Sequence, residues 1–337
     1  MRIHPLVILI VLIIGCGNKE DVDKLRFLER GNLAYVNDEI PDAIRFYDEA
    51  LIKDSTFVDA WNNKGLALMK MARYDDAIYC FDRALMFKPD YKEALLNNTL
   101  ANLEVHQHYS AMNNLDELAV FWPDSSIIPF TRGLIFADMN KPTMALDEFS
   151  KALELDRQNV EIWINMGNIF YHQNKLDTAI LLIQSAIKLD ASQPHAYNVL
   201  AMIYASQGQY KDGLKAINTA MSYKPKDAYF LNNKGFILIR LEKFETAEEN
   251  IVGSMKIDPY NAWVYRNLGL LRGAQGDFVE AARLLEKALK MDDQVDNIIA
   301  DLARTYLKLE MNDKACTLLL SAPLDEEIRL LLSEHCR

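Results

Sequence analysis

Two kinds of amphipathic segment alternate along the chain, and each carries one small residue at a fixed place. In the first kind, the small residues recur every 34 positions at Gly31, Gly65, Thr99, Gly133, Gly167, Ala201, Gly235, Gly269 and Ala303. In the second kind, they recur at Ala43, Ala77, Ala111, Ala145, Ala179, Gly213, Ala247, Ala281 and Ala315. A fixed period of this length predicts an all-α chain of tandem helix pairs.

The small residues have a packing role, because a large side chain at a helix crossing would wedge the two backbones apart. Four residues after each small residue of the second segment stands a large apolar one, which is expected to fill the space between helices. These residues are Tyr47, Phe81, Leu115, Phe149, Ile183, Ile217, Ile251, Leu285 and Leu319. Proline at the end of several repeats, as in Pro89 and Pro259, is expected to end the second helix.

Residues 58–91 match a known repeat pattern in its Trp, Gly, Ala, Phe and Pro positions, with Lys64 in place of the usual Leu. The matching residues are Trp61, Gly65, Leu68, Ala77, Phe81, Ala84 and Pro89. The chain therefore resembles the tetratricopeptide repeat family. The resemblance implies a right-handed α-solenoid of about nine repeats, with a concave face built largely from the first helix of each pair. Repeats are expected over residues 24–323, starting at 24, 58, 92, 126, 160, 194, 228, 262 and 296.

The end of such an array needs a cap, because each repeat contacts only its neighbours. Residues 324–337 supply an apolar stripe at helical spacing, formed by Ile328, Leu331 and Leu332, and are predicted to form a capping helix. Within the array, the third repeat departs most from the pattern, because Asn98, Thr99 and Asn102 stand at positions that are otherwise small or apolar. We expect this repeat to be locally loose rather than a functional hinge.

The amino terminus has the order of an export signal, with Arg2 followed by the aliphatic run Leu6–Ile14. Nine helical residues span about 14 Å, which is too short for a bilayer. The run ends at Ile13-Ile14-Gly15-Cys16, which resembles the bacterial lipobox. We interpret residues 1–15 as a lipoprotein signal peptide and residues 16–23 as the lipidated Cys16 with a short polar tether; the alternative is an ordinary signal peptide.

Such an anchor is expected to place the protein in the bacterial cell envelope. By resemblance to the sorting of enterobacterial lipoproteins, Gly17 after the anchor favours the outer membrane, with the array facing the periplasm. Surface exposure is the open alternative, and the oligomeric state, including a homo-oligomer, is also open. The formal net charge of −11 argues against nucleic acid as a partner.

Asparagine recurs on the face that the resemblance makes concave, at the sixth repeat position and near it. The amides are Asn63, Asn97, Asn165, Asn168, Asn198, Asn233 and Asn267. A carboxamide offers both donors and an acceptor, so such a ladder can hold the backbone of an extended peptide segment. Asparagine is also common at the sixth position of the family, so the ladder is either functional or family background.

Apolar residues at the ninth position, namely Leu100, Leu134 and Phe236, are expected either to line the groove or to pack against adjacent helices. Groove charge changes along the chain from acidic to basic. The acidic residues are Asp59, Glu93, Glu104, Asp138 and Glu161, and the basic ones are Arg240, Arg266, Arg304 and Lys308. The basic cluster could receive an acidic segment or a carboxyl terminus, and the alternative is surface charge without a partner.

Motifs for catalysis, cofactors or metals are not found in the sequence, and we expect no enzyme activity and no cofactor. His106 and His108 form an H-x-H in a predicted turn, with no identifiable third ligand, and we interpret them as solvated. Cys316 and Cys336 could form a disulfide in an oxidising compartment. Counting along their helices leaves them roughly two turns out of register, which favours unpaired thiols.

The sequence therefore predicts a lipid-anchored scaffold whose groove binds protein or peptide segments and assembles envelope machinery. The alternative is a non-catalytic regulatory subunit that presents substrates to an envelope enzyme or protease.

Overall fold

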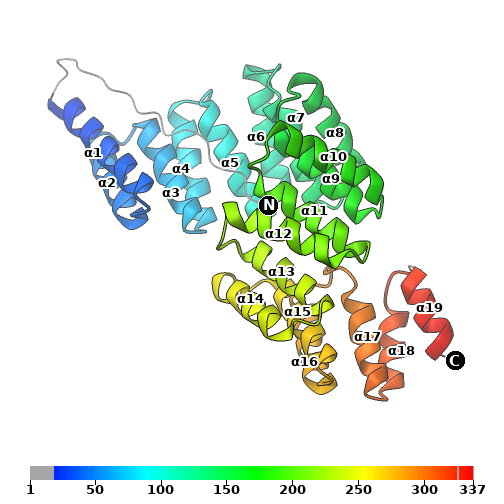
Figure 1. Cartoon of the computed structure of the whole chain (residues 1–337). Coiled ribbons are helices and arrows are strands. Elements are labelled where there is room, and N and C mark those ends of the chain that lie inside the picture. Colours follow the sequence, from blue (N-terminus) through cyan, green and yellow to red (C-terminus); the bar gives the residue numbers. More distant parts are fainter. Residues whose placement is uncertain (1–18, 325, 337) are drawn as a thin grey trace. The chain divides into compact units, whose positions relative to one another are not determined.

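The computed structural model describes residues 19–324 and 326–336, and these residues form 19 α-helices and no strand (Figure 1). The predicted signal peptide and Cys16 lie outside the described residues. None of the described helices combines the length and the apolar character needed to cross a bilayer. The chain divides into two compact units, residues 1–162 and 163–337, and the division falls inside one helix.

In the first unit, the helices pair in succession, each packing against the next. They are α1 (Lys19–Val36), α2 (Ile40–Lys53), α3 (Val58–Lys70), α4 (Tyr74–Phe87), α5 (Lys92–Glu104), α6 (His108–Phe121), α7 (Ile127–Asp138) and α8 (Pro142–Leu155). The start of α1 at Lys19 differs from expectation, because residues 19–23 of the predicted tether belong to this helix.

The division lies within α9 (Val160–His172), and the second unit continues the succession of helix pairs. Its further helices are α10 (Leu176–Leu189), α11 (Pro194–Ser206), α12 (Tyr210–Tyr223), α13 (Ala228–Arg240), α14 (Phe244–Ile257), α15 (Ala262–Ala274), α16 (Phe278–Met291), α17 (Ile298–Lys308), α18 (Asn312–Leu320) and α19 (Glu326–His335). Each unit is thus an all-α stack of helix pairs, as the repeat pattern predicts.

The period of 34 is visible in the turns between paired helices. One residue in each such turn has a positive φ, which ends the first helix in the left-handed conformation. The nine are Asp38, Ala72, His106, Asn140, Asn174, Gly208, Glu242, Gly276 and Glu310. Every second helix of a pair, from α2 to α18, begins two residues later. The turn geometry therefore repeats even where the residue is not glycine. A side chain at this position leaves the backbone in the same conformation in each of these turns.

The small and large columns meet inside each helix pair, as the packing argument predicts. A Cβ atom added to Gly65 would lie 2.4 Å from Cε1 of Phe81, and one added to Gly235 would lie 2.3 Å from Cγ1 of Ile251. Phe81 and Ile251 are fully buried. The first-helix glycine therefore leaves the space that the large side chain of the second helix fills.

The carboxy-terminal cap forms as predicted: Ile328 and Leu331 of α19 are buried against the apolar cluster of α17 and α18, and Leu332 is partly buried there. The expectation of unpaired thiols is wrong, because Cys316 and Cys336 form a disulfide with their Cα atoms 5.5 Å apart. The count followed the two helices alone, so it did not determine where α19 lies along α18. In the structure, Cys336, just past α19, lies beside Cys316 in the middle of α18.

The polar residues of the third repeat are buried, and their polar groups find partners. Asn98 donates to the Asp82 carboxylate over 2.6 Å, and Asn102 donates to both oxygens of Asn98. The Thr99 hydroxyl donates to the carbonyl of Leu95 in its own helix. The departure of this repeat from the apolar pattern therefore corresponds to a hydrogen-bonded core rather than to unpaired polar groups.

Candidate functional site

The amides of the first unit bond to one another between successive first helices. Asn97 donates to the Oδ1 of Asn62 over 2.9 Å, Asn62 donates to Asn63, and Asn63 donates to the Oδ1 of Asn32 over 2.9 Å. The Tyr47 hydroxyl completes the chain by donating to the same oxygen. All four amides are buried, so this part of the predicted ladder holds the repeats together.

The predicted ninth-position residues of the first unit pack against adjacent helices and do not line a groove. Leu134 has no exposed surface and Leu100 is 8% exposed, so both belong to the core rather than to an open groove. Burial of both the amides and the apolar residues leaves little of the predicted binding set accessible in this unit.

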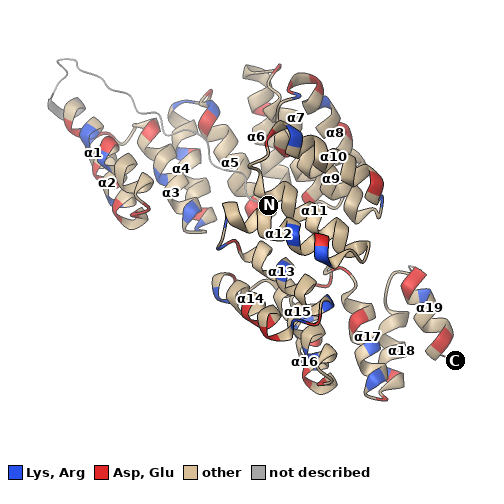
Figure 2. Ribbon diagram, in the orientation of Figure 1, with Lys and Arg blue, Asp and Glu red and all other residues tan. Residues whose placement is uncertain are grey.

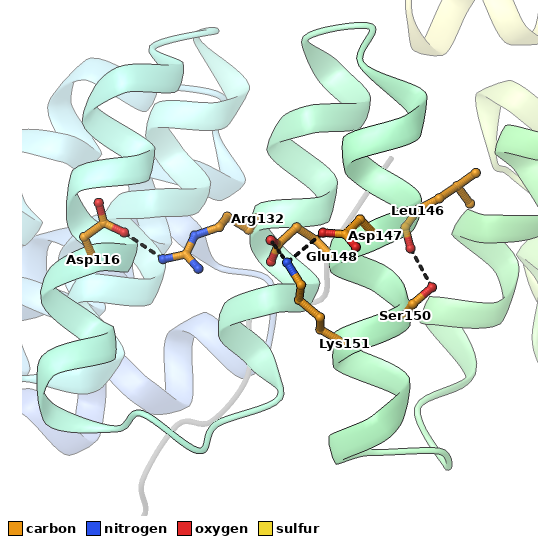
Figure 3. A network of polar contacts seen from close by, with 7 residues as sticks. All are labelled: Asp116, Arg132, Leu146, Asp147, Glu148, Ser150 and Lys151. Carbon is orange, nitrogen blue, oxygen red and sulfur yellow. Dashed lines mark hydrogen bonds and ion pairs between the residues drawn. The ribbon is translucent and has the colours of Figure 1, made fainter.

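The first unit carries a second set of contacts between repeats, which sequence reasoning missed. The seventh residue of a repeat reaches an acidic residue in the second helix of the preceding repeat. Arg132 of α7 donates to Asp116 of α6 over 2.7 Å (Figure 3), and the same spacing of 16 residues joins Lys64 to Asp48 and Asn98 to Asp82. An alignment of the repeats would have revealed these pairs, since each pair joins the same two repeat positions.

The amides of the second unit are more accessible. Asn233 donates to the Oδ1 of Asn198 over 2.9 Å, and both side chains are only partly buried. Within the described residues, no hydrogen bond is seen from the Asn198 amide group or to the Asn233 oxygen. Asn165 and Asn168 of α9 are also half-buried, whereas Asn267 is buried and donates to Asn232.

The helix α13 displays three predicted site residues along one face. Asn233, Phe236 and Arg240 follow each other at helical spacings of three and four, which places them one above another. Phe236 is half-buried, and Arg240 is exposed at the end of the helix, where its Nε donates to the hydroxyl of Tyr210 over 3.0 Å. The face therefore offers an amide, an aromatic ring and a cation within two turns of helix, and Asn198 of α11 is bonded to its amide.

The predicted basic cluster is largely neutralised within the chain. Arg266 donates from Nε and Nη2 to Oδ2 of Asp301, over 2.8 and 2.7 Å, and both side chains are nearly buried. Arg304 lies 3.7 Å from Asp301 and also pairs with Glu327 of the cap. Burial raises the pKa of the Asp301 carboxyl, against the opposing effect of the Arg266 guanidinium. Arg240 and Lys308 are exposed and, within the described residues, form no ion pair, so they are the accessible cations of the predicted set.

One contact within the second unit joins residues far apart in sequence. Nδ1 of His172, the last residue of α9, lies 3.3 Å from Oδ2 of Asp296, which precedes α17. Nearby, the Ser206 hydroxyl contacts the hydroxyl of Tyr171. The contact of His172 with Asp296 joins the end of α9 to the segment that precedes α17. Basic and acidic residues are interspersed along most helices (Figure 2).

The comparisons with known proteins agree with this architecture. Family models described as tetratricopeptide repeat match residues 58–91, 136–203, 194–227, 227–294 and 274–327. No curated protein sequence matches the chain significantly.

Two solved structures are similar in fold. The first is the APC/C hetero-tetramer Cut9–Hcn1, with a TM-score of 0.68 and 20% identity; the match covers 95% of this chain but only 64% of that chain. The second is pilF of Pseudomonas aeruginosa, with a TM-score of 0.50, 16% identity and coverage of 63% and 97%. Together with the periodic turns and the helix pairs, the family matches show that this chain belongs to the tetratricopeptide repeat family of protein-interaction scaffolds.

Proposed function

We propose that this protein is a lipid-anchored envelope scaffold that holds an extended segment of a partner protein on the second unit. The observation that carries the proposal is the face of α13, where Asn233, Phe236 and Arg240 stand in one row beside Asn198. We define this set of four residues as the α13 face. The amide and apolar residues at the corresponding positions of the first unit, such as Asn97 and Leu100, are buried, so the second unit is the favoured location.

The chemistry of the α13 face specifies what it can hold. The Asn198 and Asn233 amides keep hydrogen-bonding capacity for the backbone of an extended peptide, which they can bind without selecting its side chains. The half-buried ring of Phe236 offers an apolar surface, and exposed Arg240 offers a charge-assisted hydrogen bond to a carboxylate. The expected ligand is therefore an extended segment with an apolar residue followed or preceded by an acidic one.

Two independent features favour the cell envelope. At the lipobox-like sequence, Cys16 would carry two or three acyl chains. Two or more chains anchor a protein stably in a membrane, whereas a single chain does not. Disulfides persist in oxidising compartments, and the Cys316–Cys336 bond is consistent with a periplasmic or cell-surface location. On this proposal, the array works beside the membrane as an adaptor for other envelope proteins, with the outer membrane as the favoured site.

The test is a comparison of partners captured by in-cell crosslinking and mass spectrometry with the full-length protein and two charge-reversal variants. Arg240→Glu alters the α13 face, and we expect it to lower recovery of the specific partners by about tenfold, as for a lost charge-assisted contact. Arg283→Glu on α16 is the matched control, because Arg283 is exposed and pairs only locally with Glu280.

Both variants are expected to keep the wild-type melting temperature. Equal partner lists for Arg240→Glu and wild type would contradict binding at the α13 face, and equal losses in both variants would show a nonspecific effect of charge.

A further inference from the structure

Three side chains from two neighbouring repeats of the first unit converge at one point. Nδ1 of His106 lies 2.8 Å, and Nε2 of His108 2.6 Å, from the same oxygen of Asp138, Oδ2. The three ligand atoms all lie within 4.8 Å of one another. The H-x-H that the sequence left without a third partner therefore has one, and the partner comes from the next repeat.

The repeat geometry explains why these residues meet. His106 occupies the left-handed turn position, His108 begins α6, and Asp138 ends α7. The equivalent positions also touch in other repeats, where Lys70 pairs with Asp38 over 2.6 Å and Arg240 donates to Tyr210. The turn and the helix end are thus a regular meeting point between repeats. Only the third and fourth repeats place two imidazoles and a carboxylate there.

The cluster is accessible to an ion from solvent. The side chains of His108 and Asp138 are 26% and 31% exposed, and that of His106 is 72% exposed, so the cluster is partly shielded and still reachable from solvent.

We propose that His106, His108 and Asp138 form a binding site for a divalent transition metal ion, with Zn²⁺ as the favoured ion. Two imidazoles and one carboxylate match the ligand preference of zinc and not that of calcium or magnesium, which take oxygen ligands. Tetrahedral ligands at about 2.1 Å lie about 3.4 Å apart, so each histidine nitrogen has to move away from the Asp138 oxygen by less than about 1 Å to admit the ion. Water would complete the coordination.

A metal at this point would join the turn of the third repeat to the first helix of the fourth. Its effect would be to stabilise the pairing of these two repeats, because binding to the folded state alone adds to stability. It would also leave one coordination position open toward solvent, where a partner's side chain could bind.

The test is equilibrium dialysis of the untagged full-length protein against Zn²⁺ after treatment with a chelator. Wild type is expected to bind about one Zn²⁺ per chain and to melt at a higher temperature when zinc is added. His108→Gln and Asp138→Asn are expected to weaken zinc binding by tenfold or more and to lose the shift in melting temperature. His172→Gln, which alters a histidine of the second unit, is the matched control and should bind zinc like wild type.

Cobalt absorption provides a second readout that does not depend on stability, since tetrahedral Co²⁺ bound to wild type should give a visible spectrum that both site variants lack. The proposal would be overturned if wild type bound no zinc, or if both site variants, folded by circular dichroism, bound it as tightly as wild type.

Discussion

Replacing Asp301 by asparagine is expected to lower the free energy of unfolding of the second unit by about 3–5 kcal/mol. The reason is that Arg266 and Asp301 are nearly buried and bonded through two short contacts, so the variant leaves the Arg266 guanidinium in the interior without its counter-charge. Arg304 loses a partner as well. Urea denaturation followed by circular dichroism measures the change.

Two comparisons separate the buried pair from charge effects in general. Glu280→Gln breaks an exposed pair with Arg283 and should leave stability unchanged within error. The double variant Arg266→Met with Asp301→Val removes both charges, and valine already stands at the equivalent position as Val199. It should recover most of the loss. A single variant as stable as wild type would contradict the assigned role of this pair.

Reducing the Cys316–Cys336 bond is expected to destabilise the carboxy-terminal end of the array by about 3 kcal/mol, the value for closing a segment of about 20 residues. The melting temperature of the second unit should then fall by about 5–10 °C. The loss should be local, because α19 covers the apolar cluster of α17 and α18, and contacts in the array run between neighbours.

Hydrogen exchange with and without reductant measures this prediction. Amides of α18 and α19 should exchange faster after reduction. The amides of α4 serve as the control and should exchange at the same rate in both conditions. The only cysteine of α4, Cys80, is a buried free thiol, so the reductant has no bond to break there. Equal protection of α18 and α19 in both conditions would show that the bond adds nothing to the cap.

The fold could be predicted from the sequence because the determinants of a helix pair are local and repeat. The glycine and alanine columns, the large residue between helices and the apolar stripe of the cap each lie within one repeat. The disulfide could not be predicted, because the position of Cys336 depends on the path of the connection before α19, which the helical count does not include.

The candidate site was less predictable, because accessibility depends on neighbouring repeats. The position of Asn97 and Asn233 in their repeats is the same, yet Asn97 is buried and Asn233 only partly so. Likewise, Asp138 was visible as an acid and His106 as part of an H-x-H, but their meeting depends on the pairing of adjacent repeats. Aligning each turn with the end of the next first helix would have found it.

Binding of an extended partner segment at the α13 face is tested most directly by site-specific photocrosslinking in cells. A photoreactive amino acid replaces Phe236 in one variant and Arg283, on α16, in another. We predict a defined crosslinked partner from position 236 that is absent from position 283. The same adducts from both positions, or none from position 236 in a folded protein, would contradict binding at the α13 face.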